Sequence, residues 1–361
     1  MAAHTATATA TLDAPHTPGR GGNPPPGGAG TRARSARLPR VPRLSGLARG
    51  LGRVLGVGVP VALVATFITY GLSALTDTNP AATVLGDLAT PQDIERMNHQ
   101  FGLDKPFLAQ YFGWLGNALT GDLGYSYFTT LPVAESVGRA LPVDLSITLV
   151  AVVVAILVGG TAGIAAALNN GGRLDRAVTA VCSAASTIPP FVLGIGLIIL
   201  FSVTLPVLPS GGYVPFSEDP GQWVRFIILP GLALSLELTA EITRQLRTSL
   251  VGAMRENYVV GATVRGLSVR RVVFGHALRN AVGPALTVIG LYAPRLIGGA
   301  VVAEAVFNLP GLGHLALQAA DRGDIPVIQG VLVTSIALVL VCNAVVNAAL
   351  VRLRPAAERR S

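Results

Sequence analysis

The sequence predicts an all-α polytopic membrane protein with six transmembrane helices. Of its 361 residues, 51% are hydrophobic and 13% are charged, a balance that ordinary soluble domains do not have. Apolar runs long enough to cross a bilayer, which takes about 20 residues in a helix, alternate with more polar segments. Arginines gather in the N-terminal tail, in alternate loops and at the C-terminus, whereas acids occupy the other loops. Because arginine-rich loops stay in the cytoplasm, both termini are expected there.

The apolar runs define the six expected spans. The first is longer than the roughly 7–15 apolar residues of a secretory signal, so we interpret it as an uncleaved helix. The third contains Pro189-Pro190, and a proline pair bends a span and frees backbone carbonyls. These prolines either kink the helix for packing or line a translocation route. The expected spans are residues 54–75, 142–168, 177–205, a fourth from 223 into a basic loop, 282–303 and 327–351.

Two segments accompany a transmembrane domain that we expect over residues 51–355. Residues 1–50 are rich in Ala, Pro, Gly and then Arg, and they carry too little apolar surface to fold. We therefore expect a disordered cytoplasmic tail near anionic lipid headgroups. Residues 76–140 form the longest segment expected on the external side.

The external segment carries local helix signals. Thr90 is a suitable N-cap, with Pro91 at the first helical position and Asp93 in the first turn, which predicts a helix through about Gln100. Pro106 opens a second helix in which aromatic residues recur at helical spacing. That second helix either lies along the membrane interface or packs into a small external subdomain.

The sequence lacks the motifs of an enzyme or of a nucleic-acid-binding protein. The net charge of +8 follows the membrane topology, so no nucleic-acid partner is expected. Lys105 is the only lysine and follows Asp104, so a Gly-Lys-Ser/Thr phosphate loop is missing. The two cysteines lie in apolar runs, and the five histidines form no metal-ligand pattern. We expect no cofactor, no metal and no catalysis, and any ATP that drives this protein must be hydrolysed by a separate subunit.

The most polar stretch of the second half is residues 244–281, which we expect to form a cytoplasmic loop. It carries seven arginines against one acid, Glu256. Gly266 ends one helix-compatible run, and Ser268 is a good N-cap for the next. Because glycine adopts the left-handed conformation freely, this order predicts a helix, a tight turn and a second helix. From spacing alone, the hairpin is either a solvated loop or an interaction element.

The same stretch resembles a known family. Residues 257–284 read NYVVGATVRGLSVRRVVFGHALRNAVGP, which is similar to the coupling loop of the membrane subunits of ABC importers in the oligopeptide, dipeptide and nickel permease branch. Two further stretches, GLDKPFLAQYFGWLGNALTGDLGYSY and EAVFNLPGLGHLALQAADRGDIPVIQG, also resemble that branch. The family often has Glu-Ala where this chain has Val260-Gly261. The matching loop positions are Tyr258, Ala262, Gly266, Leu267, Ser268, His276, Arg279, Asn280 and Pro284.

The resemblance, which covers roughly residues 50–355, implies a type I ABC importer permease fold in the cytoplasmic (inner) membrane. It implies that a short coupling helix within residues 251–281 docks onto an ATPase subunit. The expected partners are a second, different homologous permease, two ATP-binding subunits, an external solute-binding protein and membrane lipids. The expected substrate is a peptide, nickel or a related small solute. The alternative is a stand-alone secondary transporter, which would need inverted repeats and broken helices with coupling-ion ligands.

Three charges fall inside the expected spans. Glu237 and Glu241 lie one helical turn apart on the fourth span, and Arg295 lies on the fifth. Charged groups at such depth are costly unless they are paired or hydrated. They therefore either hold the helices together as ion pairs or contact the substrate. Glu237 and Arg295 lie at similar distances from the inner ends of their helices, so we predict that these two residues pair.

Overall fold

The computed structural model describes residues 44–75 and 79–353, and in these residues the regular secondary structure is helical. An isolated bridge between Tyr125 and Pro132 is the one β-type pairing in that part of the chain. The tail expected to be disordered, residues 1–50, lies mostly outside the described residues. From Ser45 onward the described helices form one compact unit.

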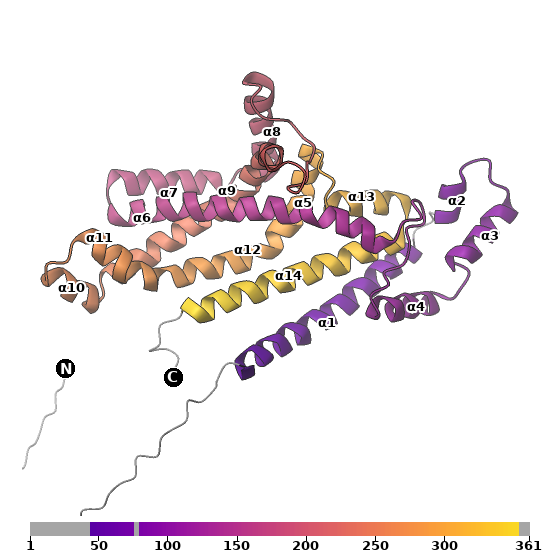
Figure 1. The fold of residues 1–361 in the computed structure, drawn as a ribbon, viewed down its shortest axis with the longest axis horizontal. Coiled ribbons are helices and arrows are strands. Elements are labelled where there is room, and N and C mark those ends of the chain that lie inside the picture. Colours follow the sequence, from indigo (N-terminus) through magenta and orange to yellow (C-terminus); the bar gives the residue numbers. More distant parts are fainter. Residues whose placement is uncertain (1–43, 76–78, 354–361) are drawn as a thin grey trace, which may run out of the picture. The chain divides into compact units, whose positions relative to one another are not determined.

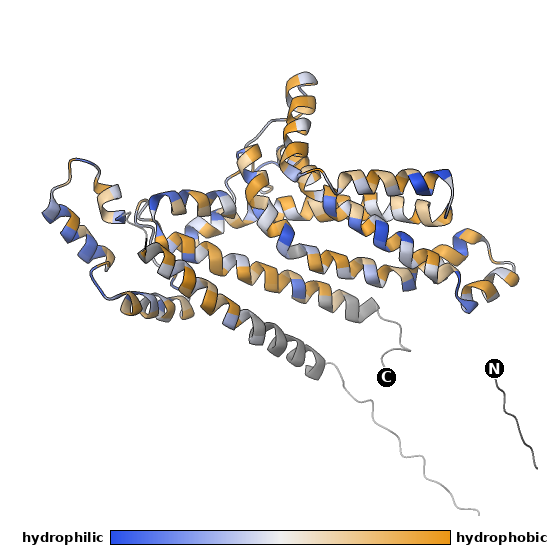
Figure 2. Cartoon of the chain, turned by 180° about the vertical axis from the view of Figure 1, so that it is seen from behind, coloured by the Kyte–Doolittle hydropathy of each residue, from blue (hydrophilic) through white to orange (hydrophobic). Residues whose placement is uncertain are grey.

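The helices include a counterpart for each expected span (Figure 1). By length and hydropathy, four of the described helices can cross a membrane alone, or up to six if each bent helix pair is one span. Six transmembrane helices are consistent with this range, although α1 is not among these candidates because its apolar stretch, Gly58–Leu72, is shorter. Figure 2 shows that the long helices are mainly hydrophobic, whereas α3 carries many hydrophilic residues. The spans are α1 (Leu44–Ala74), α5 (Val133–Val154) with η1 (Ala155–Gly159) and α6 (Gly160–Leu168), α7 (Arg173–Ala185) with α8 (Pro190–Ile198) and η2 (Ile199–Thr204), α9 (Pro220–Met254), α12 (Leu278–Phe307) and α14 (Ile325–Leu353).

The second span begins earlier than expected. We predicted its start near Pro142, but α5 begins at Val133 and carries Pro142 inside the helix. The extra turns are amphipathic, and Val133, Val137 and Ala140 are buried against α13 (Leu312–Arg322) and α14. Burial of that apolar side offsets the backbone hydrogen bond that the proline lacks.

The third span is broken where the proline pair lies. α7 and α8 meet at an angle of 98°, and Pro190 occupies the first turn of α8 (Figure 1). A proline disfavours helical conformation in the residue before it, so α7 cannot continue through Ile188-Pro189. The break was predicted from the sequence. Its consequence is that α7 packs along α6 and α9, whereas α8 contacts α9 and α12.

The segment that we expect on the external side is helical where the sequence indicated. α2 (Pro80–Leu85) precedes α3 (Pro91–Phe101), whose N-terminus is closed by a capping box between Thr90 and Asp93. The hydrogen bonds from Thr90 lower the pKa of the exposed Asp93 carboxyl. α4 (Phe107–Leu119) begins directly after Pro106. The predicted helices and their caps are thus confirmed in this segment.

The aromatic helix α4 packs on the rest of the described chain through one side, and its position at the membrane interface stays a prediction. Tyr111 is buried on α1, and its hydroxyl lies 3.1 Å from the hydroxyl of Thr66. The opposite side leaves Leu108 and Phe112 exposed. An exposed apolar side next to the membrane is what an interfacial helix needs. α4 is therefore packed on α1 and still presents a surface suited to lipid.

The core is organised around α9, which packs against α5, α6, α7, α8 and α12. The backbones of the second span and α9 lie close together at Gly159 and Gly163, four residues apart on the second span. A Cβ atom at Gly159 would lie 2.8 Å from the Thr239 carbonyl oxygen, and one at Gly163 would lie 3.0 Å from that of Thr243. The Thr243 hydroxyl donates to the Gly159 carbonyl at 3.3 Å. Small residues four apart let two membrane helices touch through their backbones.

Candidate functional site

The predicted helical hairpin is present and turns at Gly266. α10 (Asn257–Val264) ends with Gly266 at φ +80°, in the left-handed region. The Gly266 amide donates to the Thr263 carbonyl, and the Leu267 amide donates to that of Ala262. These two bonds form a Schellman motif, which satisfies the last carbonyls of α10. Ser268 is the N-cap of α11 (Val269–Val272) by backbone conformation, without a side-chain cap bond.

The hairpin is packed onto the ends of the long helices. Val259 and Ala262 on α10 are buried in an apolar cluster with Leu250 of α9, and Leu267 packs against the same cluster. η3 (Val273–Ala277) continues α11 into α12. The Asn280 side-chain amide donates to the Tyr258 hydroxyl at 2.8 Å and so joins α10 to α12. The hairpin is therefore held by both of the spans that it connects.

The outer side of α10 is apolar and uncovered by the rest of the described chain. Val264 is 83% exposed, and Tyr258 and Val260 are also exposed. His276 and Arg279 are exposed on η3 and at the start of α12. In the described chain, this apolar side of α10 is therefore left without a packing partner.

Two arginines assigned to this loop from the sequence lie instead on α9, which continues to Met254. The residues after Glu241 keep a buried apolar side, with Leu246 and Leu250 buried, so the helix does not end where the polar residues begin. Arg247 donates to both carboxylate oxygens of Asp175 on α7, at 2.9 and 2.7 Å. This two-point ion pair joins α7 to the C-terminal part of α9.

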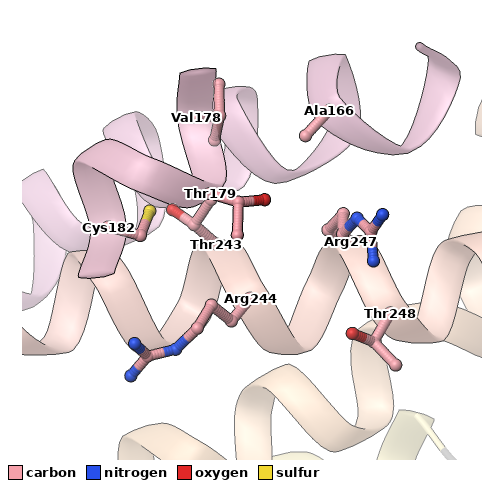
Figure 3. A pocket seen from close by; sticks show the side chains of 8 residues that line it. All are labelled: Ala166, Val178, Thr179, Cys182, Thr243, Arg244, Arg247 and Thr248. Carbon is pink, nitrogen blue, oxygen red and sulfur yellow. The ribbon is translucent and has the colours of Figure 1, made fainter. Parts of the chain in front are cut away.

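A pocket of about 170 Å³ lies between α6, α7 and α9 (Figure 3). Figure 3 shows the guanidinium groups of Arg244 and Arg247 pointing away from each other. The volume of this pocket is below the roughly 300–1,000 Å³ of small-molecule sites, so we assign no solute to the pocket. The lining residues are Ala166, Val178, Thr179, Cys182, Thr243, Arg244, Arg247 and Thr248.

The charges inside the spans form one cluster on α9 and α12. Arg295 Nη1 lies 3.1 Å from Glu237 Oε1, and the Tyr292 hydroxyl donates to the same oxygen at 3.3 Å. The Arg295 guanidinium also lies 4.9 Å from the centre of the Tyr292 ring. Glu241 pairs with Arg244 on its own helix. Of the three residues that the sequence singled out, the structure thus pairs Glu237 with Arg295, whereas Glu241, one helical turn along α9, pairs with Arg244.

Two buried acids were missed in the sequence. Asp144 on α5 and Glu304 on α12 are 2% and 0% exposed. Asp144 Oδ2 accepts the Leu312 amide and Glu304 Oε2 accepts the His314 amide, both at 2.7 Å, so the two carboxyls hold the N-terminus of α13. In the sequence, Asp144 could have been recognised because it is a single acid within an apolar run. Glu304 fell one residue beyond the fifth expected span and was interpreted as part of a loop.

A third acid, Asp324, connects the loop that contains Ser126 and Tyr127 to the start of α14. The Ser126 hydroxyl and the Tyr127 amide both donate to its carboxylate. Burial raises the pKa of Asp324 above its usual range, and the hydrogen bond from Ser126 opposes that rise. The two stretches of family resemblance that contain Ser126 and Asp324 are therefore in direct contact.

Two family models match this chain. Residues 159–359 match the inner membrane component of binding-protein-dependent transport systems. Residues 48–148 match the N-terminal region of the membrane component of the same systems. The first match covers the hairpin, the charged cluster and α13. Together the two matches extend over nearly all of the described chain.

Similar proteins carry related names. A putative peptide transport system permease protein of Brucella abortus is 39% identical over 272 residues, covering 75% of this chain and 87% of that protein. The di/tripeptide transport system permease protein DppB of Pseudomonas aeruginosa is 35% identical, covering 82% and 95%. The glutathione transport system permease protein GsiC of Escherichia coli is 34% identical, covering 84% and 96%.

These matches show a multi-pass permease subunit of the inner membrane rather than an enzyme, in a family whose ATPase is carried by separate subunits. The expected type I ABC importer permease fold agrees with the helical architecture and with both family models. The chain belongs to the family of inner membrane components of binding-protein-dependent ABC transport systems.

Proposed function

We propose that this chain forms half of the translocation pathway of an ATP-driven importer for peptides or a related small solute. A second homologous permease would form the other half, two ATP-binding subunits would supply the energy, and an external solute-binding protein would deliver the solute. The names of the similar proteins support the substrate class, since they include peptide, di/tripeptide and glutathione transport.

The observation that carries the docking proposal is the exposed side of α10. Tyr258, Val260 and Val264 present an apolar surface on a short helix whose opposite side, at Val259 and Ala262, is buried on the ends of α9 and α12. An ATPase subunit bound to the exposed side would therefore push on both long helices at once. The proposed docking element is the segment of residues 251–281.

The charges around α10 also support its position on the cytoplasmic side. Five arginines of the hairpin region are exposed, and the same region contains a single acid, Glu256. Arginine-rich loops of this length stay in the cytoplasm, which supports a topology with both termini inside and residues 76–140 outside. The matching surface on the ATPase should be an apolar groove with an acidic rim. The five arginines are Arg255, Arg265, Arg270, Arg271 and Arg279.

The alternative of a stand-alone secondary transporter has one supporting observation. The pair α7 and α8 is bent by 98°, and the end of α12 meets α13 at 79°, so two broken helices are present. Such helices carry coupling ions in secondary transporters. Uptake driven by an ion gradient without ATPase subunits would favour this alternative. Uptake that requires internal ATP and the ATPase subunits would exclude it.

Gly266→Val should leave membrane insertion intact but abolish co-purification of the ATPase subunits and solute uptake. A β-branched residue is strained at φ +80°, so the turn would rearrange and move α10. An added Cβ meets nothing within 4 Å, so the effect would come from the backbone conformation and not from a clash. The measurement is ATPase recovery on affinity-purified permease.

The matched control is Gly266→Asn, because asparagine tolerates the left-handed conformation. It should retain at least half of the ATPase recovery of wild type. Equal recovery with valine and asparagine would show that the turn does not need a left-handed residue and would remove the support for docking through α10.

A further inference from the structure

The charged cluster of α9 and α12 lies on a face that nothing else in the described chain covers. The side chains of Arg295 and Glu237 are 65% and 45% exposed. Glu237 is seventeen residues from Pro220 and seventeen from Met254, the two ends of α9. At about 1.5 Å per residue, it lies about 26 Å from either end, in the middle of the span.

Lipid tails are a poor environment for this face. A charged side chain at the centre of a membrane helix is costly unless it is paired or hydrated. The cluster carries two carboxylates, Glu237 and Glu241, and two guanidinium groups, Arg244 and Arg295. Water or protein therefore covers it, as in a translocation pathway.

Arg295 and Glu237 each retain hydrogen-bonding groups that no described residue uses. Arg295 donates to Glu237 through Nη1, and no other hydrogen bond of its guanidinium is present within the described residues. Glu237 accepts both of its bonds through Oε1. A guanidinium has a second donor edge that matches a carboxylate in two-point geometry. Both partners can thus meet an external ligand from the open side.

We propose that this cluster binds the two charged ends of a zwitterionic peptide as it crosses the membrane, an inference that rests on the proposed function. The free edge of Arg295 would receive the C-terminal carboxylate of the peptide. Glu237 and Glu241 would receive its N-terminal ammonium. The cluster has equal numbers of positive and negative groups, which suits a ligand that also carries one charge of each sign.

The spacing of the acids fits a short peptide. Glu237 and Glu241 are about 6 Å apart along α9, and Arg295 contacts the former. An extended peptide spans about 3.3–3.6 Å per residue, so its two ends lie about 7–10 Å apart for two or three residues. A di- or tripeptide can therefore reach from Arg295 to Glu241.

Exchange of ion pairs also explains how such a site could release its ligand. The peptide replaces the Glu237–Arg295 contact with two similar contacts, so that no charge is left unpaired at depth. Exposed ion pairs contribute little net free energy each, so the exchange is nearly balanced. A site in a translocation pathway must recognise its ligand without binding it tightly.

The test is uptake by the whole transporter in proteoliposomes, with its solute-binding protein outside and ATP inside. Arg295→Gln should lower the ratio of trialanine uptake to trialanine amide uptake at least tenfold relative to wild type. Glu237→Gln should lower the ratio of trialanine to N-acetyl-trialanine by a similar factor. Because the solute-binding protein is the same in every arm, its own preference cancels in these comparisons.

The matched control is Arg225→Gln, near the outer end of the same helix, where Arg225 donates to the Val207 carbonyl. Its ratios should equal those of wild type. If Arg295→Gln reduces uptake of the free and amidated peptides by the same factor, the ion pair only supports the fold and the site is overturned. If wild type takes up no trialanine with ATP, the peptide assignment itself fails. If uptake is driven by ATP but the ratios of Arg295→Gln and Glu237→Gln equal those of wild type, the proposed binding site is wrong and the proposed function stands.

Discussion

Replacing Glu304 with leucine should strongly destabilise the folded protein, whereas Glu304→Gln should remain close to wild type. Leucine would leave the partly buried His314 amide without its acceptor, and an orphaned buried group costs about 1–3 kcal/mol. Glu304 Oε1 is also buried and has no donor among the described residues, although the Asp144 carboxyl lies next to it. Two carboxyls can bond to each other only if one of them carries a hydrogen.

Glutamine provides that hydrogen permanently. Its oxygen can accept the His314 amide, and its NH₂ group can donate to Asp144. The measurement is the temperature at which each variant loses its monodisperse peak in size-exclusion chromatography after heating in detergent. Leucine should lower that temperature by several degrees more than glutamine does. Equal losses for the two variants would show that the carboxyls share no hydrogen.

Gly163→Val should prevent the second span from packing on α9. The added Cβ would lie 3.0 Å from the Thr243 carbonyl oxygen and 3.2 Å from the Leu246 Cβ, and neither the backbone nor a Cβ atom can move without shifting a helix. Overpacking of this kind costs about 1–3 kcal/mol and occasionally more. The expected result is a marked loss of monodisperse protein after extraction from the membrane.

The matched control is Gly160→Val, because an added Cβ at Gly160 meets nothing within 4 Å. Both changes introduce the same side chain into one helical segment, so helix propensity is nearly constant. Gly160→Val should therefore give close to the wild-type yield. A loss as large as that of Gly163→Val would mean that valine disfavours this helix itself and that the contact with α9 is unimportant.

The features predicted from the sequence were those set by neighbouring residues. The capping box at Thr90 and the break at Pro189-Pro190 depend on backbone geometry within one or two turns. The left-handed turn at Gly266 has the same local origin. Such signals need no knowledge of the rest of the chain, and the structure agrees with each of them.

The features that the sequence did not reveal depend on residues far apart in the chain. Asp144 and Leu312 are 168 positions apart, and only the fold brings the acid to the N-terminus of α13. The early start of α5 and the late end of α9 have a related cause, because tertiary burial extends both helices past a proline or a polar residue. A single sequence contains no direct signal for such contacts.

Because α9 is one continuous helix, it can tilt as a unit about its midpoint. Its 35 residues form one helix from Pro220 to Met254, which is longer than the hydrocarbon core of a bilayer. Because Glu237 is at its midpoint, a tilt of about 10° would move each end by about 4–5 Å in opposite directions and leave the midpoint nearly in place. If an ATPase subunit binds α10 as proposed, its push would narrow one mouth of the proposed pathway while it widened the other, and the proposed solute site would lie close to the pivot.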